Sequence, residues 1–336
     1  MLATMFSTRL PHHFVNLTIR RKSAYNKTIL RSSCFTVGYD PARPGGRIGN
    51  QLFQYAAVVY VAWLTGRTPL ILSRRSVLKP IFDFETGRLG SRKQCPRRPF
   101  SCTSFNRCTN GIADNVPIEL IRLGCGWNCT RQFEEKLRHE LRFHRELMNF
   151  VHRFLSNRVP PRWKGSTFVR VGVHVRRGDF LSSAGYRRGF TIATKEYLNK
   201  SMTYFVDRYS RVQFIVTSDG IAWCIQNIKV SWFNAERVNI IFSIRHSAAQ
   251  DLALLASCDH TIVSTGTFTW WVGWLANGTT IYYSNFPRRG SSLWNLNVRA
   301  ATFFPPTWIG MNWEKLCEFN RLIFFKDKNW NVYNNV

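Results

Sequence analysis

The sequence lacks an apolar stretch long enough to cross a membrane or to form the core of a signal peptide. Its longest apolar run, Leu52 to Leu64, is interrupted by Gln54. It falls short of the roughly 20 apolar residues that a spanning helix needs, and it is typical of a buried helix. Residues 1–35 are basic and polar, and we expect them to be poorly ordered.

Acidic residues are also scarce. The chain has 19 Asp and Glu against 47 Lys and Arg, a formal net charge of +28. Such an excess attracts nucleic acids, acidic glycans, anionic membranes and nucleotide diphosphates. A nucleic-acid-binding surface needs exposed aromatic side chains among its basic residues. Many of the 12 Trp, 11 Tyr and 26 Phe residues lie instead in apolar runs, so we expect no nucleic-acid partner.

Metal-binding motifs are missing as well. There is no Asp-x-Asp motif, and the close pair Cys125 and Cys129 has no matching second pair, as a zinc site requires. We therefore expect no metal ion. Several of the nine cysteines gather in one region rich in turn residues: Cys95, Cys102, Cys108, Cys125 and Cys129. Disulfide bonds in an oxidising compartment explain this clustering better than a metal site.

Sequons for N-glycosylation favour the same kind of compartment. They begin at Asn16, Asn26, Asn128, Asn199 and Asn277. Each is a short pattern that also arises by chance. Together with the cysteines they predict a protein of the secretory pathway.

What the sequence does contain is a globular α/β pattern. Hydrophobic residues make up 45% of the chain, enough for one large core or two medium cores. The stretch from Phe35 to Leu72 predicts a strand, a glycine turn, a helix at Gln51–Trp63 and a strand at Thr68–Leu72. The basic stretch Arg88–Arg107 is typical of a surface loop.

The middle of the chain predicts a helix and then a domain boundary. A charged amphipathic helix is expected from Arg131 to Leu155, and Pro160-Pro161 ends it. Short apolar strands and helices alternate beyond this point, which favours a parallel sheet covered on both faces. The strands are predicted at Thr167–Val175, Gln213–Thr217, Val238–Phe242, His260–Val263 and Thr280–Tyr283, and the helices at Lys195–Tyr209, Gln250–Ser257 and Phe268–Ala276.

The segment Val171–Phe180 places charged side chains at the carboxyl end of a predicted strand, where ligands bind in such sheets. They are His174, Arg176, Arg177 and Asp179. Adjacent arginines repel each other unless an anion or carboxylates lie nearby, and a guanidinium group binds a diphosphate in bidentate fashion. The alternative is that Arg177 pairs with Asp179 and that His174 is a core residue.

The segment Gly46–Ala57 combines a glycine turn with the start of a helix. Glycines allow backbone to approach a ligand, and the helix start offers free amides. The side-chain amides of Asn50 and Gln51 suit sugar hydroxyls. No Gly-Lys-Ser/Thr follows, so this is not a Walker loop. A simple turn is the alternative.

The segment Asp259–Trp271 runs from a strand through Ser264-Thr265-Gly266-Thr267 into a helix. Hydroxyl groups and amides at such a turn can hold phosphate oxygens. The alternative is an N-capped helix, and the tryptophans that follow, Trp270, Trp271 and Trp274, are typical of a core.

These three segments, with Phe214–Gly220 and Trp223-Cys224 between them, resemble the α-1,2-fucosyltransferases of glycosyltransferase family 11. The patterns that carry the resemblance are Gly-Arg-x-Gly-Asn-Gln, His-Val-Arg-Arg-Gly-Asp and Ser/Thr-x-Gly-Thr-Phe, which occur in the family's order between Gly45 and Phe286. The His-x-Arg-Arg-x-Asp pattern is also similar to that of α-1,6- and protein O-fucosyltransferases.

The resemblance implies a GT-B-like fold, in which two Rossmann-like domains face a cleft. The expected parts are a basic segment at 1–35, an acceptor-side domain with the cysteine-rich region at 36–160, a GDP-fucose-binding domain at 161–300, and a C-terminal segment at 301–336 that packs back on the domains. The implied reaction moves fucose, with inversion, from GDP-β-L-fucose to the 2-hydroxyl of a terminal β-galactoside on a glycan. GDP-fucose is a substrate, and arginines are expected to replace a metal ion in stabilising the leaving diphosphate.

The resemblance also implies roles for individual residues. Arg176, Arg177 and Asp179 are expected to be catalytic. The donor is expected to contact His174, Arg176, Asp219, Ser264, Thr265 and Thr267. The acceptor side is expected to contain Arg47, Asn50 and Gln51.

Three alternatives and two departures accompany this prediction. The protein could transfer fucose to another linkage or acceptor, bind polyanions, or bind glycans without turnover. Animal members of the family usually begin with a membrane anchor, in type II topology in the Golgi membrane, and none is visible here. We expect a Golgi protein whose N-terminus is incomplete or assisted by another targeting route. The basic cysteine-rich stretch Arg88–Cys129 matches no motif of the family.

Overall fold

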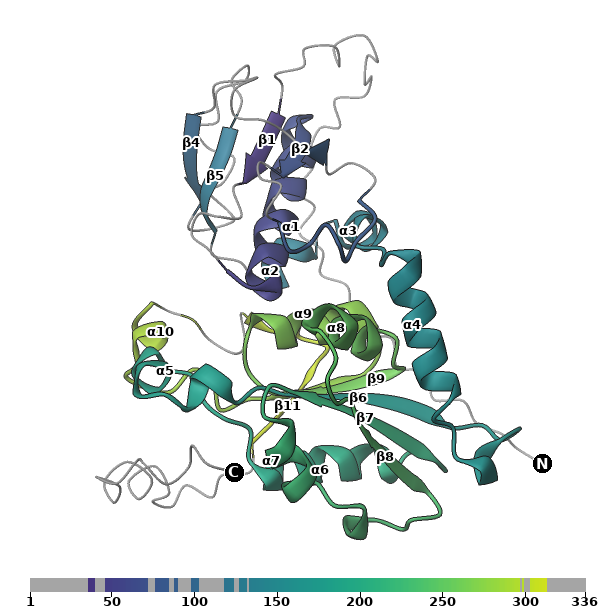
Figure 1. Ribbon diagram of the computed structural model, residues 1–336. Coiled ribbons are helices and arrows are strands. Elements are labelled where there is room, and N and C mark those ends of the chain that lie inside the picture. The colour runs from purple at the N-terminus through teal and green to yellow at the C-terminus, as the bar shows by residue number, and fades with distance from the viewer. Residues whose placement is uncertain are drawn as a thin grey trace, which may run out of the picture. The chain divides into compact units, whose positions relative to one another are not determined.

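Two parallel β-sheets, each accompanied by helices, form the chain in a computed structural model (Figure 1). The structure describes residues 36–39, 46–71, 76–84, 88–89, 98–102, 118–123, 127–131, 133–296, 298 and 303–312. The α/β class predicted from the sequence is confirmed. Residues 1–35 and the side chains of the five clustered cysteines lie outside the described part, and so do the predictions made for them.

The first sheet has the strand order β3-β2-β1-β5-β4, and all its neighbouring strands are parallel. Its strands are β1 (Thr36–Tyr39), β2 (Thr68–Ile71), β3 (Arg88–Leu89), β4 (Arg98–Cys102) and β5 (Ile118–Leu123). The prediction of a surface loop at Arg88–Arg107 was therefore wrong, because β3 and β4 lie within it. These short strands are stabilised by main-chain pairing with β2 and β5, which their own sequence does not reveal.

Helix α1 (Ile48–Thr65) follows the glycine turn and is buried over most of its length. Every residue from Leu52 to Ala62 is buried except Gln54. A helix that is apolar on all sides needs partners on all sides. It contacts β1 and β2 of the first sheet and α9 (Thr267–Ala276) beside the second. Phe53 packs on Trp270 and Trp271 with ring centroids 4.9 and 5.0 Å apart.

The single helix predicted from Arg131 to Leu155 was wrong, because the structure has two helices there. They are α3 (Glu134–Glu140) and α4 (Arg145–Ser156). Between them, Phe143 forms an antiparallel bridge with Phe82, and the backbone nitrogen of His144 donates to the carbonyl of Ile81 at 3.0 Å. Main-chain groups that would have continued the helix are thus used in a long-range pairing.

The second sheet has the strand order β11-β10-β9-β6-β7-β8, again entirely parallel. Counted from β6, this is the doubly wound order 3-2-1-4-5-6, in which the direction of winding changes between β6 and β9. Ligands bind at the carboxyl ends of the strands at this point. Its strands are β6 (Val169–Val175), β7 (Val212–Ser218), β8 (Val238–Phe242), β9 (His260–Val263), β10 (Thr280–Tyr283) and β11 (Ile309–Met311).

Helices cover both faces of this sheet (Figure 1). Alternate residues of β6, namely Val171, Val173 and Val175, share a buried cluster with α6 (Lys195–Val206). On the other face, Gly172 allows Leu255 of α8 (Ala248–Ala256) to approach closely. Successive residues of a strand point to opposite faces of the sheet, so β6 contacts α6 on one face and α8 on the other. Four short helices among the described residues had not been predicted: α2 (Trp127–Thr130), α5 (Ser183–Arg188), α7 (Ile221–Asn227) and α10 (Ser292–Asn295).

Trp270, Trp271 and Trp274 on α9 are buried, as predicted. Residues 303–312 pack beside this region and end in β11, while the remainder of the predicted C-terminal segment lies outside the described residues. Within the described ranges, no helix combines the length and apolar character that crossing a bilayer requires.

Candidate functional site

The carboxyl end of β6 presents Arg176 to two carboxylates. Its Nη1 lies 2.5 Å from Oδ2 of Asp219, which follows β7, and its Nη2 pairs with Oδ1 of Asp179. The Arg176 side chain is 18% exposed. Two carboxylates on one arginine fix its orientation, as a preorganised anion site requires.

Arg177 turns away from this pair. Its backbone nitrogen donates to Oδ1 of Asp219 at 2.8 Å, and its guanidinium carbon lies 3.9 Å from the ring centroid of Trp223. Burial lowers the pKa of Arg177 from its ordinary value. The alternative pairing of Arg177 with Asp179 does not occur, because Asp179 pairs with Arg176.

His174 lies beneath the arginines and is buried. Burial, and then the charge of Arg176, lowers its pKa to about 3, so its imidazole is neutral at physiological pH. Its Nδ1 is 2.7 Å from Oγ1 of Thr269, and that hydroxyl is 3.1 Å from the carbonyl of Thr265. Since the hydroxyl has one proton, it donates to Thr265 while His174 donates to it. His174 thereby joins the end of β6 to α9.

Three hydroxyl groups at the start of α9 have different surroundings. Ser264 accepts a hydrogen bond from the backbone nitrogen of Arg176 at 2.8 Å, and Thr265 donates to the carbonyl of Thr191 at 2.7 Å. Both residues are buried. The hydroxyl of Thr267 is more exposed and donates to Oδ1 of Asn50 at 2.8 Å. The structure therefore brings Thr267 and Asn50 together and uses the other two hydroxyls within the fold.

The first turns of α1 and α9 meet at Gly49. A β-carbon at Gly49 would overlap the backbone nitrogen of Phe268 and lie 2.5 Å from the carbonyl carbon of Thr267. Neither helix has a side-chain cap or an acidic residue in its first turn. The positive ends of two helix dipoles, with uncapped amides, therefore converge beside the Asn50–Thr267 hydrogen bond.

The remaining acceptor-side candidates differ from each other. Arg47 is exposed at the start of α1. Gln51 is buried, its Nε2 donates to the carbonyl of Gly46 at 3.0 Å, and its Oε1 accepts from the backbone nitrogen of Val77 at 3.2 Å. Gln51 thus holds the glycine turn in place, and both ends of its amide are occupied.

A second polar cluster, which had not been predicted, lies at the carboxyl end of β8. Ser243 Oγ is 2.8 Å from Oδ1 of Asp251 and 2.7 Å from Nδ1 of His246. Burial raises the pKa of Asp251 to about 6, although the Ser243 hydrogen bond opposes this. A carboxyl group with such a pKa at the ligand-binding edge is a candidate functional group. Its only sequence signal was a polar residue directly after a predicted strand.

This pKa predicts that stability depends on pH. Below about pH 4, Asp251 is protonated in both states, whereas between about pH 4 and 6 it ionises more readily in the unfolded chain. We expect the free energy of unfolding to fall by roughly 1–3 kcal/mol over that range and to level off above it. Asp251→Asn should lack this contribution. Denaturant unfolding of both proteins at pH 4, 5, 6 and 7.5 tests this, and parallel pH profiles would contradict it.

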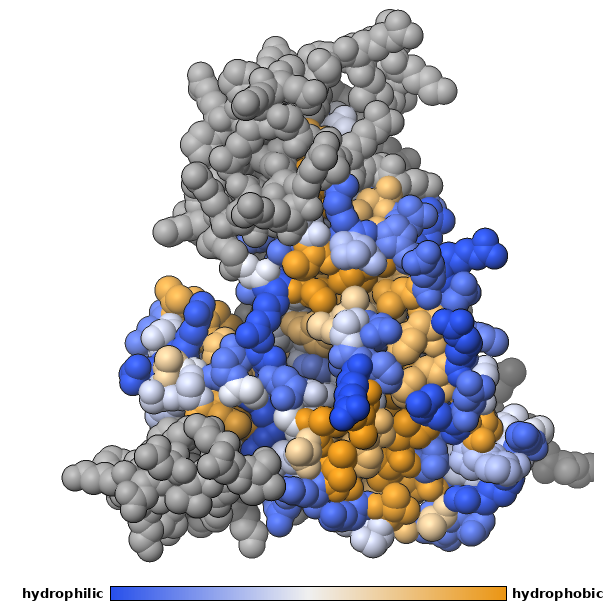
Figure 2. Space-filling view, viewed as in Figure 1, coloured by the Kyte–Doolittle hydropathy of each residue, from blue (hydrophilic) through white to orange (hydrophobic). Residues whose placement is uncertain are grey.

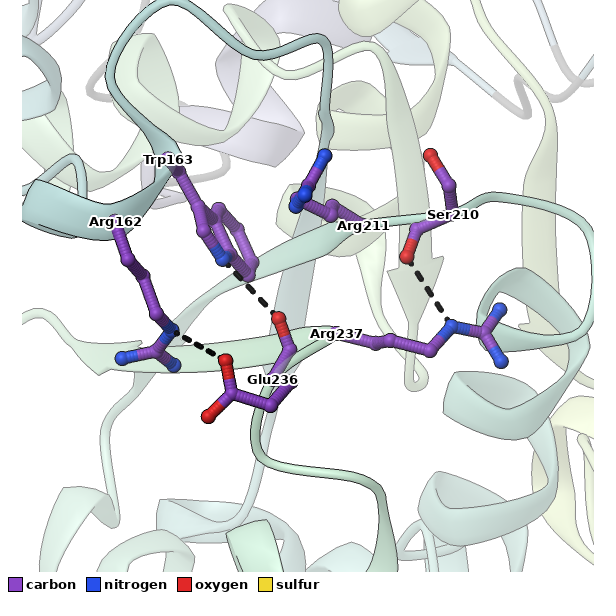
Figure 3. A pocket seen from close by; sticks show the side chains of 6 residues that line it. All are labelled: Arg162, Trp163, Ser210, Arg211, Glu236 and Arg237. Atoms are coloured by element: carbon purple, nitrogen blue, oxygen red, sulfur yellow. Dashed lines mark hydrogen bonds and ion pairs between the residues drawn. The ribbon is translucent and has the colours of Figure 1, made fainter.

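A cavity of about 430 Å³ lies at the opposite, amino edge of the second sheet (Figure 3). It is lined by Arg162, Trp163, Ser210, Arg211, Glu236 and Arg237. Arg237 donates to the carbonyls of Val206 and Ser210 at 2.7 and 3.1 Å, so it caps the end of α6. Arg162 pairs with Glu236 at 3.6 Å. No motif residue lines this cavity, and the candidate site is at the carboxyl edge.

The profile of glycosyl transferase family 11 matches residues 2–312 of the sequence. The chain belongs to this family. It is 32% identical over 280 residues to galactoside α-(1,2)-fucosyltransferase 1 of Oryctolagus cuniculus, which covers 80% of this chain and 72% of the relative. It is 34% identical over 274 residues to galactoside α-(1,2)-fucosyltransferase 2 of Pongo pygmaeus, covering 79% and 77% of the two chains.

The solved structures include one whose fold is similar to that of this family 11 chain. A mutant of Arabidopsis thaliana FUT1 in complex with GDP superposes with a TM-score of 0.53 at 12% sequence identity, covering 82% of this chain and 76% of that one. The GT-B-like fold expected from the sequence is thereby confirmed.

Proposed function

We propose that this family 11 glycosyltransferase moves fucose from GDP-β-L-fucose to the 2-hydroxyl of a terminal β-galactoside on a glycan. The names of its relatives support the donor sugar and the acceptor. The observation that carries the proposal is Arg176, fixed by Asp179 and Asp219 at the switch point of the second sheet. Anion-binding groups at this position fit a nucleotide-sugar donor.

The proposed reaction is a direct displacement with inversion. The acceptor hydroxyl attacks the anomeric carbon of fucose, the bond from that carbon to the β-phosphate oxygen breaks, and GDP leaves with additional negative charge. The hydroxyl proton passes to a nearby carboxylate or phosphate oxygen. The guanidinium group of Arg176 and the free amides at the start of α9 stabilise the departing diphosphate.

Asp179 and Asp219 orient Arg176 in this proposal, and Asp219 has a second role. It follows β7, the second strand of the doubly wound order. In such sheets, an acidic residue there contacts the ribose of a bound nucleotide. We therefore assign Asp219 to the guanosine side of the site. His174, Ser264 and Thr265 position the arginine and α9 through their hydrogen bonds.

The acceptor side is assigned to Arg47 and Asn50. Oδ1 of Asn50 already accepts from Thr267, which leaves its amide nitrogen to donate to a sugar hydroxyl or to the donor phosphate. Gln51 supports this side by holding the glycine turn. The fold brings Asn50 to the same place as Thr267, although the two residues are far apart in the sequence.

The direct test is incubation with GDP-fucose and a panel of β-galactosides, followed by determination of the product linkage. Fucose at the 2-hydroxyl of galactose is the expected product. Transfer to another hydroxyl or sugar would establish the alternative linkage. GDP-fucose binding without transfer to any acceptor would instead indicate a glycan-binding protein without turnover.

Transfer is expected to survive EDTA. Arginine and helix amides supply the charge stabilisation that a metal ion provides in other enzymes. Among the described residues, no three His, Cys, Asp or Glu side chains converge as metal ligands. Initial rates of fucosyl transfer, measured without EDTA and with 5–10 equivalents of EDTA relative to the protein, should agree within about twofold. Loss of transfer that Mn²⁺ or Mg²⁺ restores would contradict this expectation.

We further propose that the protein works in the Golgi lumen, at the membrane. The sequons and the clustered cysteines support this location. Asn277 begins a sequon at the left-handed end of α9, and its side chain is exposed. Asn199 lies within α6 and is half-buried, and the serine of its sequon, Ser201, is fully buried.

An N-glycan is therefore expected on Asn277 and not on Asn199. A glycan on Asn277 projects into solvent, whereas one at Asn199 would disturb the packing of α6. Mass spectrometry of protein from its native source, before and after enzymatic deglycosylation, measures both sites. Asn277→Gln should remove one glycan, and Asn199→Gln should change nothing. An unmodified Asn277 together with nine free thiols would contradict the proposed location in the Golgi lumen. It would not contradict the proposed fucosyl transfer, which depends on other residues.

A further inference from the structure

Four arginines lie together in the lobe that follows the Arg176 segment. We define this arginine lobe by Arg187 and Arg188 at the end of α5, and by Arg288 and Arg289 before α10. Helices α5 and α10 contact each other, and the backbone nitrogen of Arg288 donates to the carbonyl of Gly189 at 3.0 Å. At the left of Figure 2, where Figure 1 labels α5 and α10, the surface is mainly hydrophilic with smaller hydrophobic areas.

The segments that build the arginine lobe contain no carboxylate. There is no Asp or Glu between residues 180 and 195 or between residues 260 and 313. Arg187 and Arg188 are exposed, and neither side chain has a hydrogen-bond or ion-pair partner in the described part of the chain. Like charges held together without counter-charge raise the free energy of the empty lobe, and an anion from outside relieves that repulsion.

Of the other two arginines, Arg288 is held against an aromatic ring, whereas Arg289 is exposed. The guanidinium carbon of Arg288 lies 4.0 Å from the ring centroid of Tyr186, and its Nη2 donates to the carbonyl of that residue at 3.2 Å. Arg289 lies 5.9 Å from the ring of Trp294. An arginine held as Arg288 is loses less rotamer entropy when it binds a planar or tetrahedral oxyanion.

A stack of aromatic rings connects the arginine lobe to the candidate site. Phe180 and Phe190 are parallel with centroids 3.8 Å apart, and Phe286, two residues before Arg288, lies 6.1 Å from Phe190. Arg176 lies 5.2 Å from the ring of Phe180, and a β-carbon at Gly266 would contact the same ring at 3.3 Å. The lobe is thus rigidly attached beside the groups assigned to the leaving diphosphate.

We propose that the arginine lobe binds a sulfate or carboxylate group carried by the acceptor glycan, so that the preferred acceptors are acidic galactosides. This inference rests on the proposed function. The diphosphate of the donor is already matched by Arg176 and the start of α9, which leaves the lobe for a different anion. A guanidinium group held against an aromatic ring, as that of Arg288 is, suits a defined oxyanion better than the diffuse charge of a membrane surface.

The test compares acceptors that differ only in charge. A neutral β-galactoside oligosaccharide is paired with the same compound carrying a sulfate, and with one carrying a carboxylate, on the sugar next to galactose. The wild-type protein should show a kcat/KM at least about tenfold higher for the charged acceptors, and raising the salt from 0.05 to 0.5 M should reduce this ratio. Comparing kcat/KM for the sulfated acceptor with kcat/KM for the carboxylated acceptor shows which of the two groups the lobe binds.

The double variant Arg187→Ala/Arg188→Ala should bring the ratio close to one while keeping kcat/KM for the neutral acceptor. The control is Arg211→Ala at the amino edge of the sheet, which removes an arginine without touching the lobe and should keep the ratio. Equal kcat/KM for neutral and acidic acceptors in the wild type would overturn the proposal. So would an unchanged ratio in the double variant, or a raised KM for GDP-fucose with the neutral acceptor.

Two further measurements distinguish other failures. If the wild type, but not the double variant, binds vesicles of 30% phosphatidylserine, and both proteins prefer acidic acceptors equally, the lobe is a membrane contact and the proposal fails. If no galactoside is fucosylated, the proposed function fails. Calorimetric binding of the sulfated galactoside, present in the wild type and lost in the double variant, would then still support the lobe as an anion site.

Discussion

Replacing Arg176 with alanine is expected to lower kcat for fucosyl transfer by about 10²- to 10³-fold, equivalent to about 3–4 kcal/mol of transition-state stabilisation. The guanidinium group is the charge that the fold holds most firmly at the switch point, through Asp179 and Asp219. Its effect is largest as GDP departs, so kcat should fall more than the affinity for the donor. Single-turnover rates with saturating GDP-fucose measure this directly.

Three companion variants make the Arg176 result specific. Arg176→Lys keeps the charge and loses the planar fork, so it should recover only part of the activity. Arg211→Ala, on the opposite edge of the sheet, should have normal kcat. Removing Arg176 leaves Asp179 and Asp219 without their shared partner, so the melting temperature of each protein must be compared. A folded Arg176→Ala protein with near-normal kcat would remove this arginine from the mechanism. Asp179→Asn should show an intermediate loss if that carboxylate orients the arginine.

Gly49→Ala is expected to lower kcat/KM by about 100-fold and the free energy of unfolding by roughly 1–3 kcal/mol. The added methyl group would overlap the backbone of Thr267 and Phe268. Backbone cannot rotate out of the way as a side chain can, so α1 and α9 must separate. That movement lengthens the Asn50–Thr267 hydrogen bond and displaces the two helix starts from one another. Steady-state kinetics and denaturant unfolding measure the two effects.

Gly165→Ala is the matched control for the alanine at Gly49. A β-carbon at Gly165 meets nothing within 4 Å, but the residue has a φ of +75°, so alanine there costs roughly 1–2 kcal/mol of backbone strain. Both variants should therefore be destabilised, and only Gly49→Ala should lose activity. Equal activity in the two variants would show that the α1–α9 contact stabilises the protein without positioning the site.

The second sheet was predictable because its signals are local. The bounds of β8, β9 and β10 agree with those predicted from the sequence, since each is a short apolar run between turn residues. Helix α9 begins one residue before its predicted start. In a parallel sheet with both faces covered, an apolar strand and its neighbouring helix are specified by a few adjacent residues.

The predictions that were wrong concern segments whose local structure depends on residues far away in the sequence. The break between α3 and α4 depends on the pairing of residues 142–144 with residues 81–83, which no periodicity within the helix could indicate. Strands β3 and β4 likewise depend on partners, because β3 has only two residues and β4 contains Pro99. Backbone hydrogen bonding to a remote segment overrides local propensity in both places.

The sequence alone determined which residue types carry the chemistry of this protein. The arginines and aspartate at the end of β6, the glycine turn before α1 and the hydroxyl-rich start of α9 stand out in the sequence, because strand ends and helix starts are where ligands bind in α/β folds. It also determined the family, since three spaced motifs occur in one order.

Only the tertiary structure decided which partner each of these residues has. It pairs Arg176, rather than Arg177, with Asp179, and adds Asp219 from the next strand. It buries Gln51 and Thr265 in hydrogen bonds within the fold, joins Asn50 to Thr267, and assembles Ser243, His246 and Asp251. The physical reason is that a residue's chemical type is given by its own position in the sequence. Hydrogen bonds and ion pairs, in contrast, form over about 3–4 Å. Many of their partners are far apart in the sequence, and only the packing of the sheet and helices brings them this close.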